Sequence, residues 1–383
     1  MEKSLMIVAL IALFIITLAI IITDVMMSST SVVSEHNLIK DNGIVGGILV
    51  VSVFILGFRG LTGTDTPAYA LVFWNPRYAN GMESGFLWLS QLSKSLIGSF
   101  SFFQVIVGVL SFVGIGAILW SMRKESLQTK LLLLTFFLLA GPYFVLFNNM
   151  RQGITISMLL LMVVVINFSD NSLVRLGVSA LLVLAGIFVH KTIVVGAVFV
   201  LMGYLIGRLL NNVEIPRRNM LLVGLTFVGI LIPPLNFGWI LKLMGYVGVS
   251  YAHAYADSPL LMNSRSGTAI VNALMVLFIV VFSNFLKRDN TTEQPFLQKV
   301  SLGMTLLYVI VSPFAGSSEL MYRLFFYVLP FIGVTFTEIY KNVSQASKTK
   351  RLVIVGAEFL FILLNFAHIV MANLQGILPY MGF

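Results

Sequence analysis

The sequence predicts an all-α fold, a polytopic bundle of transmembrane helices with about 12 to 13 spans. Of its 383 residues, 58% are hydrophobic and 10% are charged, and the mean hydropathy is +0.98. A soluble domain carries about 25% charged residues, so this chain must place most of its apolar surface against lipid. Its apolar runs are long and unbroken, whereas a membrane barrel alternates polar and apolar residues in segments of about ten.

Each expected span is a mainly apolar run close to the length of about 20 residues that crosses a bilayer. The runs lie at 5–23, 44–58, 100–120, 131–147, 153–168, 173–189, 192–207, 220–240, 266–286, 297–314, 320–340 and 352–374. A weaker candidate, 85–98, contains Gln91 and Lys94 and would either span or lie along the membrane surface. We expect the first run to be a retained helix rather than a signal peptide, because no small-residue cleavage site follows it. No repeat or soluble insert interrupts the series, which predicts a single integral membrane domain over residues 1–383.

The basic residues lie mostly in alternate loops, which predicts how the chain is oriented. Cytoplasmic loops of membrane proteins carry an excess of Lys and Arg. Beyond residue 100 every second loop is basic, with Arg123, Lys124, Lys130, Arg175, Arg208, Arg217, Arg218, Lys287, Arg288, Lys299, Lys341, Lys348, Lys350 and Arg351. We expect these loops in the cytoplasm and the intervening loops outside a bacterial inner membrane. The N-terminal part fits either orientation, depending on whether 85–98 spans.

Several functional classes are disfavoured by what the sequence lacks. There is no cysteine, which excludes disulfides and thiolate metal sites. No phosphate-binding loop of an ATP motor, no dinucleotide fingerprint and no metal-ligand spacing occurs. The net charge of +9 is explained by the basic loops, so we do not expect nucleic acid as a partner. We expect no cofactor and no metal, and a substrate that arrives already activated.

Two polar groups are expected at external ends of spans, where charges are commonly functional. In the segment 148–153, Arg151 offers a planar fork that binds phosphate or carboxylate, and Gln152 adds a neutral donor. The simpler alternative is a short turn whose arginine reaches the water. His190 and Lys191 interrupt a long apolar stretch; they would bind an anion or move a proton, or form only a polar turn.

Further candidates lie in two other external segments and a loop. Glu319 and Arg323 share one helical face at a spacing of i, i+4, so they form either a structural ion pair or a ligand site. The loop 241–265, which ends at Arg265, is rich in aromatic residues that suit sugar stacking or an ordinary aromatic belt. The segment 59–86 is rich in glycine, and Asp65 directly before Thr-Pro is typical of a helix start.

These residues together resemble the Wzy-type bacterial polysaccharide polymerases, especially the EpsG-like exopolysaccharide branch. The resemblance covers most of the chain in architecture, and its most specific part is 59–86. The matching motifs, in order, are Arg59, Gly63-Thr64-Asp65-Thr66, Tyr69, Glu83-Ser84-Gly85-Phe86, Arg151-Gln152, His190-Lys191 and Tyr322-Arg323.

The resemblance implies an enzyme that needs no metal and joins lipid-linked repeat units at the outer face of the inner membrane. Its implied partners are an undecaprenyl-pyrophosphate-linked oligosaccharide, membrane lipid and a chain-length regulator protein. It also implies that 59–84 and the N-terminus lie outside. On this hypothesis the candidates for the catalytic base are Asp65, Glu83, His190 and Glu319. The candidates that bind the substrate or its pyrophosphate are Arg59, Tyr69, Arg151, Gln152, Lys191, Arg265, Tyr322 and Arg323.

Three alternatives remain open at the level of sequence. An O-antigen ligase or related glycosyltransferase would use much the same arginines. A lipid-linked oligosaccharide flippase or transporter would show broken helices, charges near the middle of the bilayer and inverted repeats. A non-catalytic subunit of an export complex would tolerate alanine at its external arginines.

Overall fold

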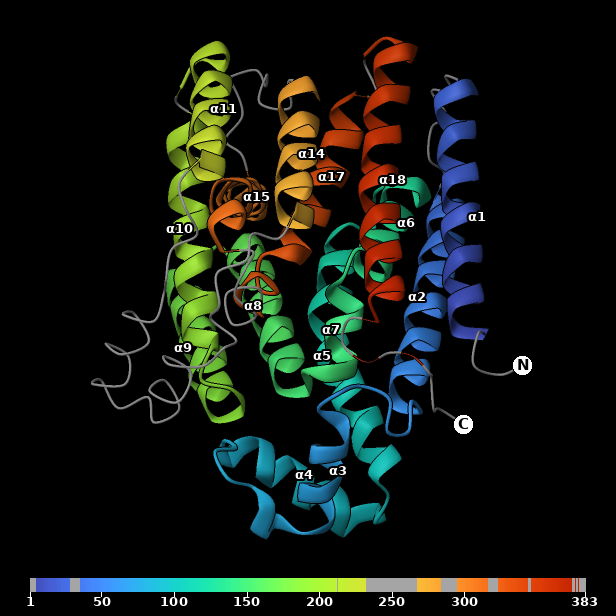
Figure 1. The fold of residues 1–383 in the computed structure, drawn as a ribbon, viewed down its shortest axis with the longest axis vertical. Coiled ribbons are helices and arrows are strands. Elements are labelled where there is room, and N and C mark those ends of the chain that lie inside the picture. The colour runs from blue at the N-terminus through green and yellow to red at the C-terminus, as the bar shows by residue number, and fades with distance from the viewer. Residues whose placement is uncertain are drawn as a thin grey trace. The chain divides into compact units, whose positions relative to one another are not determined.

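The computed structural model describes residues 5–27, 35–211, 213–231, 267–283, 295–315, 323–343, 346–373, 376 and 378. All the regular structure in these segments is helical (Figure 1), which confirms the predicted fold class. The helices are α1 (Leu5–Met27), α2 (Glu35–Gly57), α3 (Thr66–Trp74), η2 (Pro76–Tyr78), α4 (Ser84–Ile97), α5 (Phe100–Ser121), α6 (Leu127–Leu139), α7 (Pro142–Asn148), α8 (Met150–Phe168), α9 (Ser172–Val189), α10 (Ile193–Asn211), α11 (Ile215–Leu231), α14 (Gly267–Ser283), α15 (Phe296–Ala315), α17 (Leu329–Asn342) and α18 (Lys348–Met371).

Within the described segments, nine stretches are long and apolar enough to cross a membrane. They are α1, α2, α5, the α6–α7 pair, α8, α9, α10, α15 and α18. Nine of the 12 to 13 predicted spans are therefore confirmed. The runs expected at 220–240, 266–286 and 320–340 appear as α11, α14 and α17, with described lengths of 17, 17 and 14 residues. These three runs extend beyond the described residues.

The chain divides into two compact units. The first consists of Met1–Ala197, Pro295–Leu297 and Phe336–Phe383, and the second of Val198–Gln294 and Gln298–Thr335. The prediction of a single domain stays a prediction. In the first unit, α5 packs along α2 and α8, and α8 packs along α9. The backbone N–H of Gly114 in α5 donates to the hydroxyl of Ser157 in α8 at 2.7 Å, a close approach that small residues allow.

The second unit is held by the same kind of small-residue contact. Gly203 of α10 lies against Gly303 of α15 so closely that a Cβ on Gly303 would overlap the Gly203 carbonyl. The hydroxyl groups of Thr305 and Thr335 are hydrogen-bonded at 2.8 Å and are both buried. Buried hydroxyl groups that pair across helices stabilise packing where lipid supplies no hydrogen-bond partner.

The run expected at 131–147 is one buried stretch that bends in its middle. Gly141 has φ = 127°, which suits glycine, and Pro142 starts α7 with its φ already set for a helix. The Tyr143 hydroxyl donates to the carbonyl of Ser52 at 3.0 Å and anchors α7 to α2. Because α7 ends at Asn148 and α8 begins at Met150, the two helices meet in a sharp corner with almost no loop.

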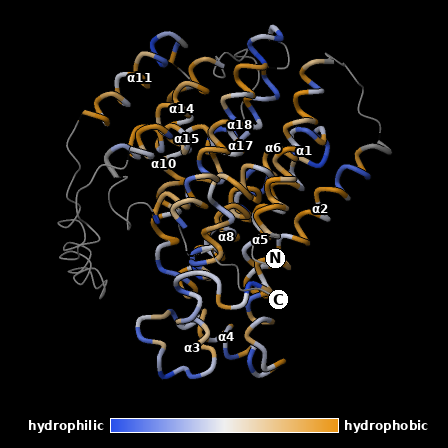
Figure 2. The backbone as a smooth tube through the Cα atoms, turned by 45° about the vertical axis from the view of Figure 1, so that its right-hand side comes forward, coloured by the Kyte–Doolittle hydropathy of each residue, from blue (hydrophilic) through white to orange (hydrophobic). Residues whose placement is uncertain are grey.

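Helices α3 and α4 lie together at one end of the long helices α2 and α5 of the first unit (Figures 1 and 2). The 14 residues of α4 extend about 21 Å, which is too short for a hydrocarbon core of about 30 Å. Its inward face buries Phe86, Ser90 and Ser93, each 1% exposed, whereas Trp88 and Leu96 point outward and are 65% and 66% exposed. Large apolar groups on an outward face are expected to have lipid around them. This arrangement favours the interfacial interpretation of 85–98 over a span.

This pattern predicts that Trp88 lies in the membrane interface. The chain has four tryptophans, so a variant that keeps Trp88 and carries Phe at positions 74, 120 and 239 reports on α4 alone. In liposomes, we expect its fluorescence to be quenched more by lipids brominated near the headgroup end of the acyl chain than by lipids brominated deep in the chain. The matched variant that also carries Trp88→Phe gives the background. Strong quenching by aqueous iodide without quenching by either lipid would show that α4 faces water.

Candidate functional site

The loop between α2 and α3 turns sharply, and glycine permits the turn. Gly60 and Gly63 have φ of 61° and 105°, values that side chains other than that of glycine rarely tolerate. A Cβ on Gly63 would overlap the backbone carbonyl of Phe147, so the loop sits directly on α7. The Gly63 N–H also donates to the carbonyl of Gly376 at 3.0 Å, which ties the loop to the C-terminal segment.

The start of α3 is bound to the corner between α7 and α8. The Asn148 side-chain oxygen accepts hydrogen bonds from the Thr64 hydroxyl at 2.7 Å and from the Asp65 backbone N–H at 2.6 Å. The Thr66 hydroxyl donates to the carbonyl of Phe147 at 2.9 Å. Asp65 occupies the N-cap position of α3, as expected, although its side chain makes no capping hydrogen bond. These bonds fix the position of α3 against the helix that carries Arg151.

Glu83, at the N-cap of α4, is the centre of a polar cluster built from three separate segments. Its Oε2 forms an ion pair with Nη1 of Arg151, in the first turn of α8. Its Oε1 lies 3.2 Å from Nδ1 of His190 and accepts from the backbone N–H of Lys191, also at 3.2 Å. The Glu83 side chain is 5% exposed, whereas those of Arg151 and His190 are each 21% exposed. Glu83 is therefore enclosed, while its two partners still reach the surface.

Close backbone packing brings Glu83 to His190. A Cβ on Gly85 in α4 would lie 2.8 Å from the carbonyl of Phe188 in α9, so α4 crosses α9 at a distance that only glycine allows. His190 caps the C-terminus of α9, and its N–H donates to the carbonyl of Gly186 at 2.7 Å. The interruption predicted at 190–191 is thus a tight turn between α9 and α10.

The surroundings of Glu83 keep it ionised. Burial alone would raise its pKa, but the hydrogen bond with His190, the charge of Arg151 and the N–H of Lys191 outweigh burial and lower the pKa to about 2. The contribution of these contacts to stability is therefore complete above the ordinary value of 4.5 and is lost as the pH falls toward 2. A carboxylate held this firmly is a weak proton acceptor at neutral pH, so Glu83 is a poor candidate for the base.

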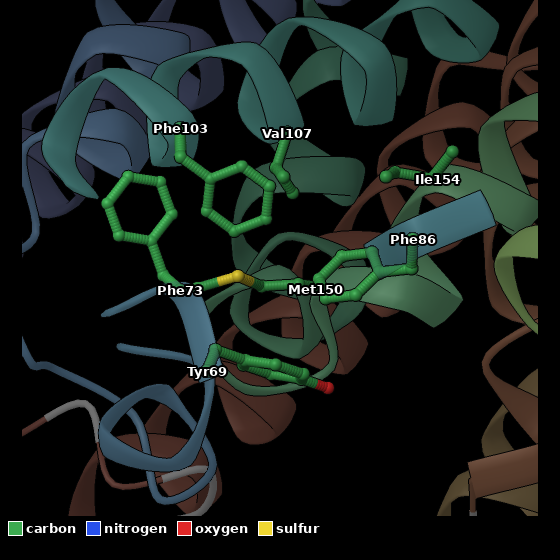
Figure 3. Close-up of a cluster of buried hydrophobic side chains, with 7 residues drawn as sticks. All are labelled: Tyr69, Phe73, Phe86, Phe103, Val107, Met150 and Ile154. Carbon is green, nitrogen blue, oxygen red and sulfur yellow. The ribbon is translucent and has the colours of Figure 1, made fainter. Parts of the chain in front are cut away.

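A buried aromatic cluster supports the polar one. It comprises Tyr69, Phe73, Phe86, Phe103, Val107, Met150 and Ile154 (Figure 3). The Tyr69 ring packs edge-on against Phe86, with 5.4 Å between centroids, and its centroid lies 6.0 Å from Cζ of Arg151. Tyr69 is only 5% exposed, so it packs beneath the arginine instead of presenting an open face to a sugar.

The other predicted site residues are placed as follows. Arg59 is fully buried, donates from Nη1 to the carbonyl of Leu56 at 2.7 Å and lies 5.7 Å from the centroid of the Phe147 ring, contacts that brace the α2–α3 loop. Gln152 is 4% exposed within α8. Arg323 belongs to the second unit and is half-buried. Glu319, Tyr322 and Arg265 lie outside the described residues, so the proposed pairing of Glu319 with Arg323 stays a prediction.

No metal-binding group is evident in the part of the chain that the structure describes. Within it, no three His, Asp or Glu side chains are arranged to hold a metal ion. The cluster around Glu83 instead combines one carboxylate with an arginine, a histidine and the backbone N–H of Lys191. The arginine suits anions and the histidine suits proton transfer.

The glycine at position 63 predicts a stability difference between two otherwise similar substitutions. We expect Gly63→Ala to lower the free energy of unfolding by at least about 1 to 3 kcal/mol, because alanine is strained at this φ and its Cβ would overlap Phe147. Gly46→Ala is the control: Gly46 lies within α2, and a Cβ added there would have no atom within 4 Å, so alanine should raise stability by about 0.5 to 1 kcal/mol. Thermal unfolding in detergent, followed by circular dichroism, measures both. Equal melting temperatures would show that the α2–α3 loop is not tied to α7.

Comparison with known proteins agrees with this architecture. A family model described as the EpsG family matches residues 46–381, which includes every predicted site residue. No curated protein and no solved structure matches the chain. With nine stretches able to cross a membrane and a match over most of its length, the chain is a multi-span membrane protein that belongs to the EpsG family, which is linked to exopolysaccharide synthesis.

Proposed function

We propose that this protein is a polysaccharide polymerase. It transfers a glycan from undecaprenyl pyrophosphate onto the next lipid-linked repeat unit, at the outer face of the bacterial inner membrane. The observation that carries this proposal is the cluster of Arg151, His190 and the backbone N–H of Lys191 around the carboxylate of Glu83, within a chain of the EpsG family.

The arginine of the cluster suits a pyrophosphate leaving group. Arg151 balances the charge of Glu83, and its side chain, which is 21% exposed, still reaches the surface where a ligand would bind. Arg151 also lies in the first turn of α8, where the helix dipole adds partial positive charge. Cationic donors fixed in place before the reaction stabilise the charge that develops on a departing group, often the largest single contribution to catalysis.

The location of the cluster suits a substrate that is half lipid and half sugar. Glu83 directly precedes α4, whose outward residues Trp88 and Leu96 indicate contact with lipid. A pyrophosphate headgroup lies at the same boundary between hydrocarbon and water. The polyprenyl tail would then lie along the apolar faces of the neighbouring spans while the glycan extends into the water.

Two alternative functions explain the same observations less completely. A flippase should show broken helices with charges near the middle of the bilayer. The chain does have a break, at 140–142 between α6 and α7, but its residues Ala140, Gly141 and Pro142 are uncharged. An O-antigen ligase-like transferase would use the same cluster with a different acceptor, and an experiment must separate it from a polymerase.

Deletion of the gene distinguishes these functions. Surface and lipid-linked glycans of the deletion strain and its parent are resolved on a gel. A polymerase predicts that long chains collapse to single repeat units that are still exported and attached. Long lipid-linked chains that accumulate unattached would identify a ligase instead, and single units retained on the cytoplasmic side would identify a flippase.

Arg151 allows a sharper prediction, because its planar fork differs from the point charge of lysine. We expect Arg151→Ala to slow polymerisation by about 10²- to 10³-fold, the usual effect of removing one preorganised charge-stabilising donor. Arg151→Lys should be nearly as slow, since lysine cannot keep one bond to Glu83 while offering a second donor in the same plane. Chain length is read from the glycan gel of complemented deletion strains.

The matched control is Arg77→Lys in η2, an exposed arginine of the same region. It should leave the glycan pattern unchanged. Normal chain length in Arg151→Lys would contradict a role for the arginine fork in binding pyrophosphate.

A further inference from the structure

We infer that Nε2 of His190 is the base that takes the proton from the acceptor hydroxyl, and that Glu83 is the positioning residue that orients the ring. This inference rests on the proposed function and deepens it by choosing among its candidate bases. It follows from which nitrogen of His190 is engaged and which carboxylates are engaged elsewhere.

The contact with Glu83 determines the state of the imidazole ring. Nδ1 of His190 lies 3.2 Å from Oε1 of Glu83, and an ionised carboxylate only accepts hydrogen bonds. Nδ1 therefore carries the hydrogen, and in the neutral ring the lone pair resides on Nε2. Nε2 makes no hydrogen bond within the described residues, and the side chain is 21% exposed. A carboxylate that holds one ring nitrogen while the other accepts a proton is the arrangement of hydrolase triads.

The ring is held from several directions, as a base must be. Oε1 of Glu83 also accepts from the N–H of Lys191 at 3.2 Å, and Oε2 is paired with Arg151. The carbonyl of His190 accepts from the N–H of Ile193 at 3.1 Å, which closes the turn between α9 and α10. Both the carboxylate and the backbone of the histidine are thus fixed relative to the anion-binding arginine.

Of the other candidate bases, the structure describes Glu83 and Asp65, and both are less suitable than His190. Glu83 has its two oxygens occupied by three donors and is 5% exposed, so it cannot approach a sugar hydroxyl. Asp65 is half-buried at the start of α3, with its backbone N–H bound to Asn148 rather than to the Glu83 cluster. It remains the best competitor and is tested beside His190.

The step conserves atoms and electrons. The acceptor O–H bond breaks and its proton moves to Nε2, which makes an imidazolium ion paired with Glu83. The oxygen forms a bond to the anomeric carbon of the donor glycan as the bond from that carbon to the pyrophosphate oxygen breaks. The electron pair of the broken bond leaves on the pyrophosphate, whose charge Arg151 meets. The products are the extended lipid-linked glycan and undecaprenyl pyrophosphate, and water then removes the proton from His190.

The test uses the full-length protein in liposomes, with lipid-linked single units extracted from the deletion strain as both donor and acceptor. We expect His190→Ala to lower the maximal rate of chain extension by about 10²- to 10⁴-fold, the usual contribution of a general base, with little change in KM. Added imidazole should restore part of that rate, because it can occupy the vacated space and accept the proton. Arg151→Ala is the matched control, since imidazole should not restore its activity.

A second variant separates catalysis from structure. Asparagine at position 190 can still donate to Glu83 from the place of Nδ1, yet it has no nitrogen that accepts a proton. We expect His190→Asn to be folded by size-exclusion chromatography and as slow as His190→Ala. Glu83→Gln should be slow as well, and imidazole should not rescue it.

Three outcomes would overturn the inference. Near-normal extension by His190→Asn would show that the histidine serves only to hold Glu83. Loss of extension in Asp65→Asn, together with normal rates in His190→Ala, would move the base to α3. If the wild-type protein itself forms no chains from lipid-linked units, the proposed function fails first and this inference fails with it.

Discussion

A carboxylate enclosed by donors from two distant segments organises this end of the molecule. Glu83 contacts Arg151 of α8 and, in the turn after α9, His190 and the backbone of Lys191, and both segments are far from Glu83 in sequence. An ionised carboxylate is costly to bury unless each oxygen is hydrogen-bonded. These contacts therefore fix the segment between α3 and α4 at one position on the helices beneath it. They also fix the first turn of α8 and the turn after α9.

The same contact sets the chemical character of each partner. Pairing with Glu83 leaves part of Arg151 at the surface and holds it over the ring of Tyr69. It also fixes which nitrogen of His190 faces outward. One buried acid thus prepares a cation for an anionic leaving group and a base for a hydroxyl, without itself touching either. Removing it would leave the guanidinium of Arg151 without a counter-ion.

Helix positions could be predicted from sequence because hydropathy is a local property. The runs expected at 100–120 and 173–189 appear as Phe100–Ser121 and Ser172–Val189. The break between α6 and α7 has its signal in Gly141-Pro142, although run length alone treats this stretch as one span. The predicted number of spans is not confirmed for three runs, because α11, α14 and α17 are described over lengths too short to cross a membrane by themselves.

The candidate site could be predicted only in part. The residue types of Arg151, His190 and Glu83 indicated that they belong to a site, but their contacts depend on how α4 crosses α9 at Gly85. Arg59 was predicted to bind substrate, but the structure buries it completely. Nothing in the sequence indicates that an arginine before a glycine-rich loop is buried.

The hydrogen bond between the Gly63 N–H and the Gly376 carbonyl has a practical meaning for the handling of this protein. It joins the loop that carries Asp65 to the chain that follows the last long helix. Reporter fusions for mapping membrane topology are commonly made by truncating a protein after a chosen helix. A fusion point placed just after α18 but ahead of residue 376 would remove this bond while leaving every described span intact. Such a fusion could report a correct orientation from a protein whose α2–α3 loop has lost one of its ties, so activity and topology should be measured on chains that retain Gly376.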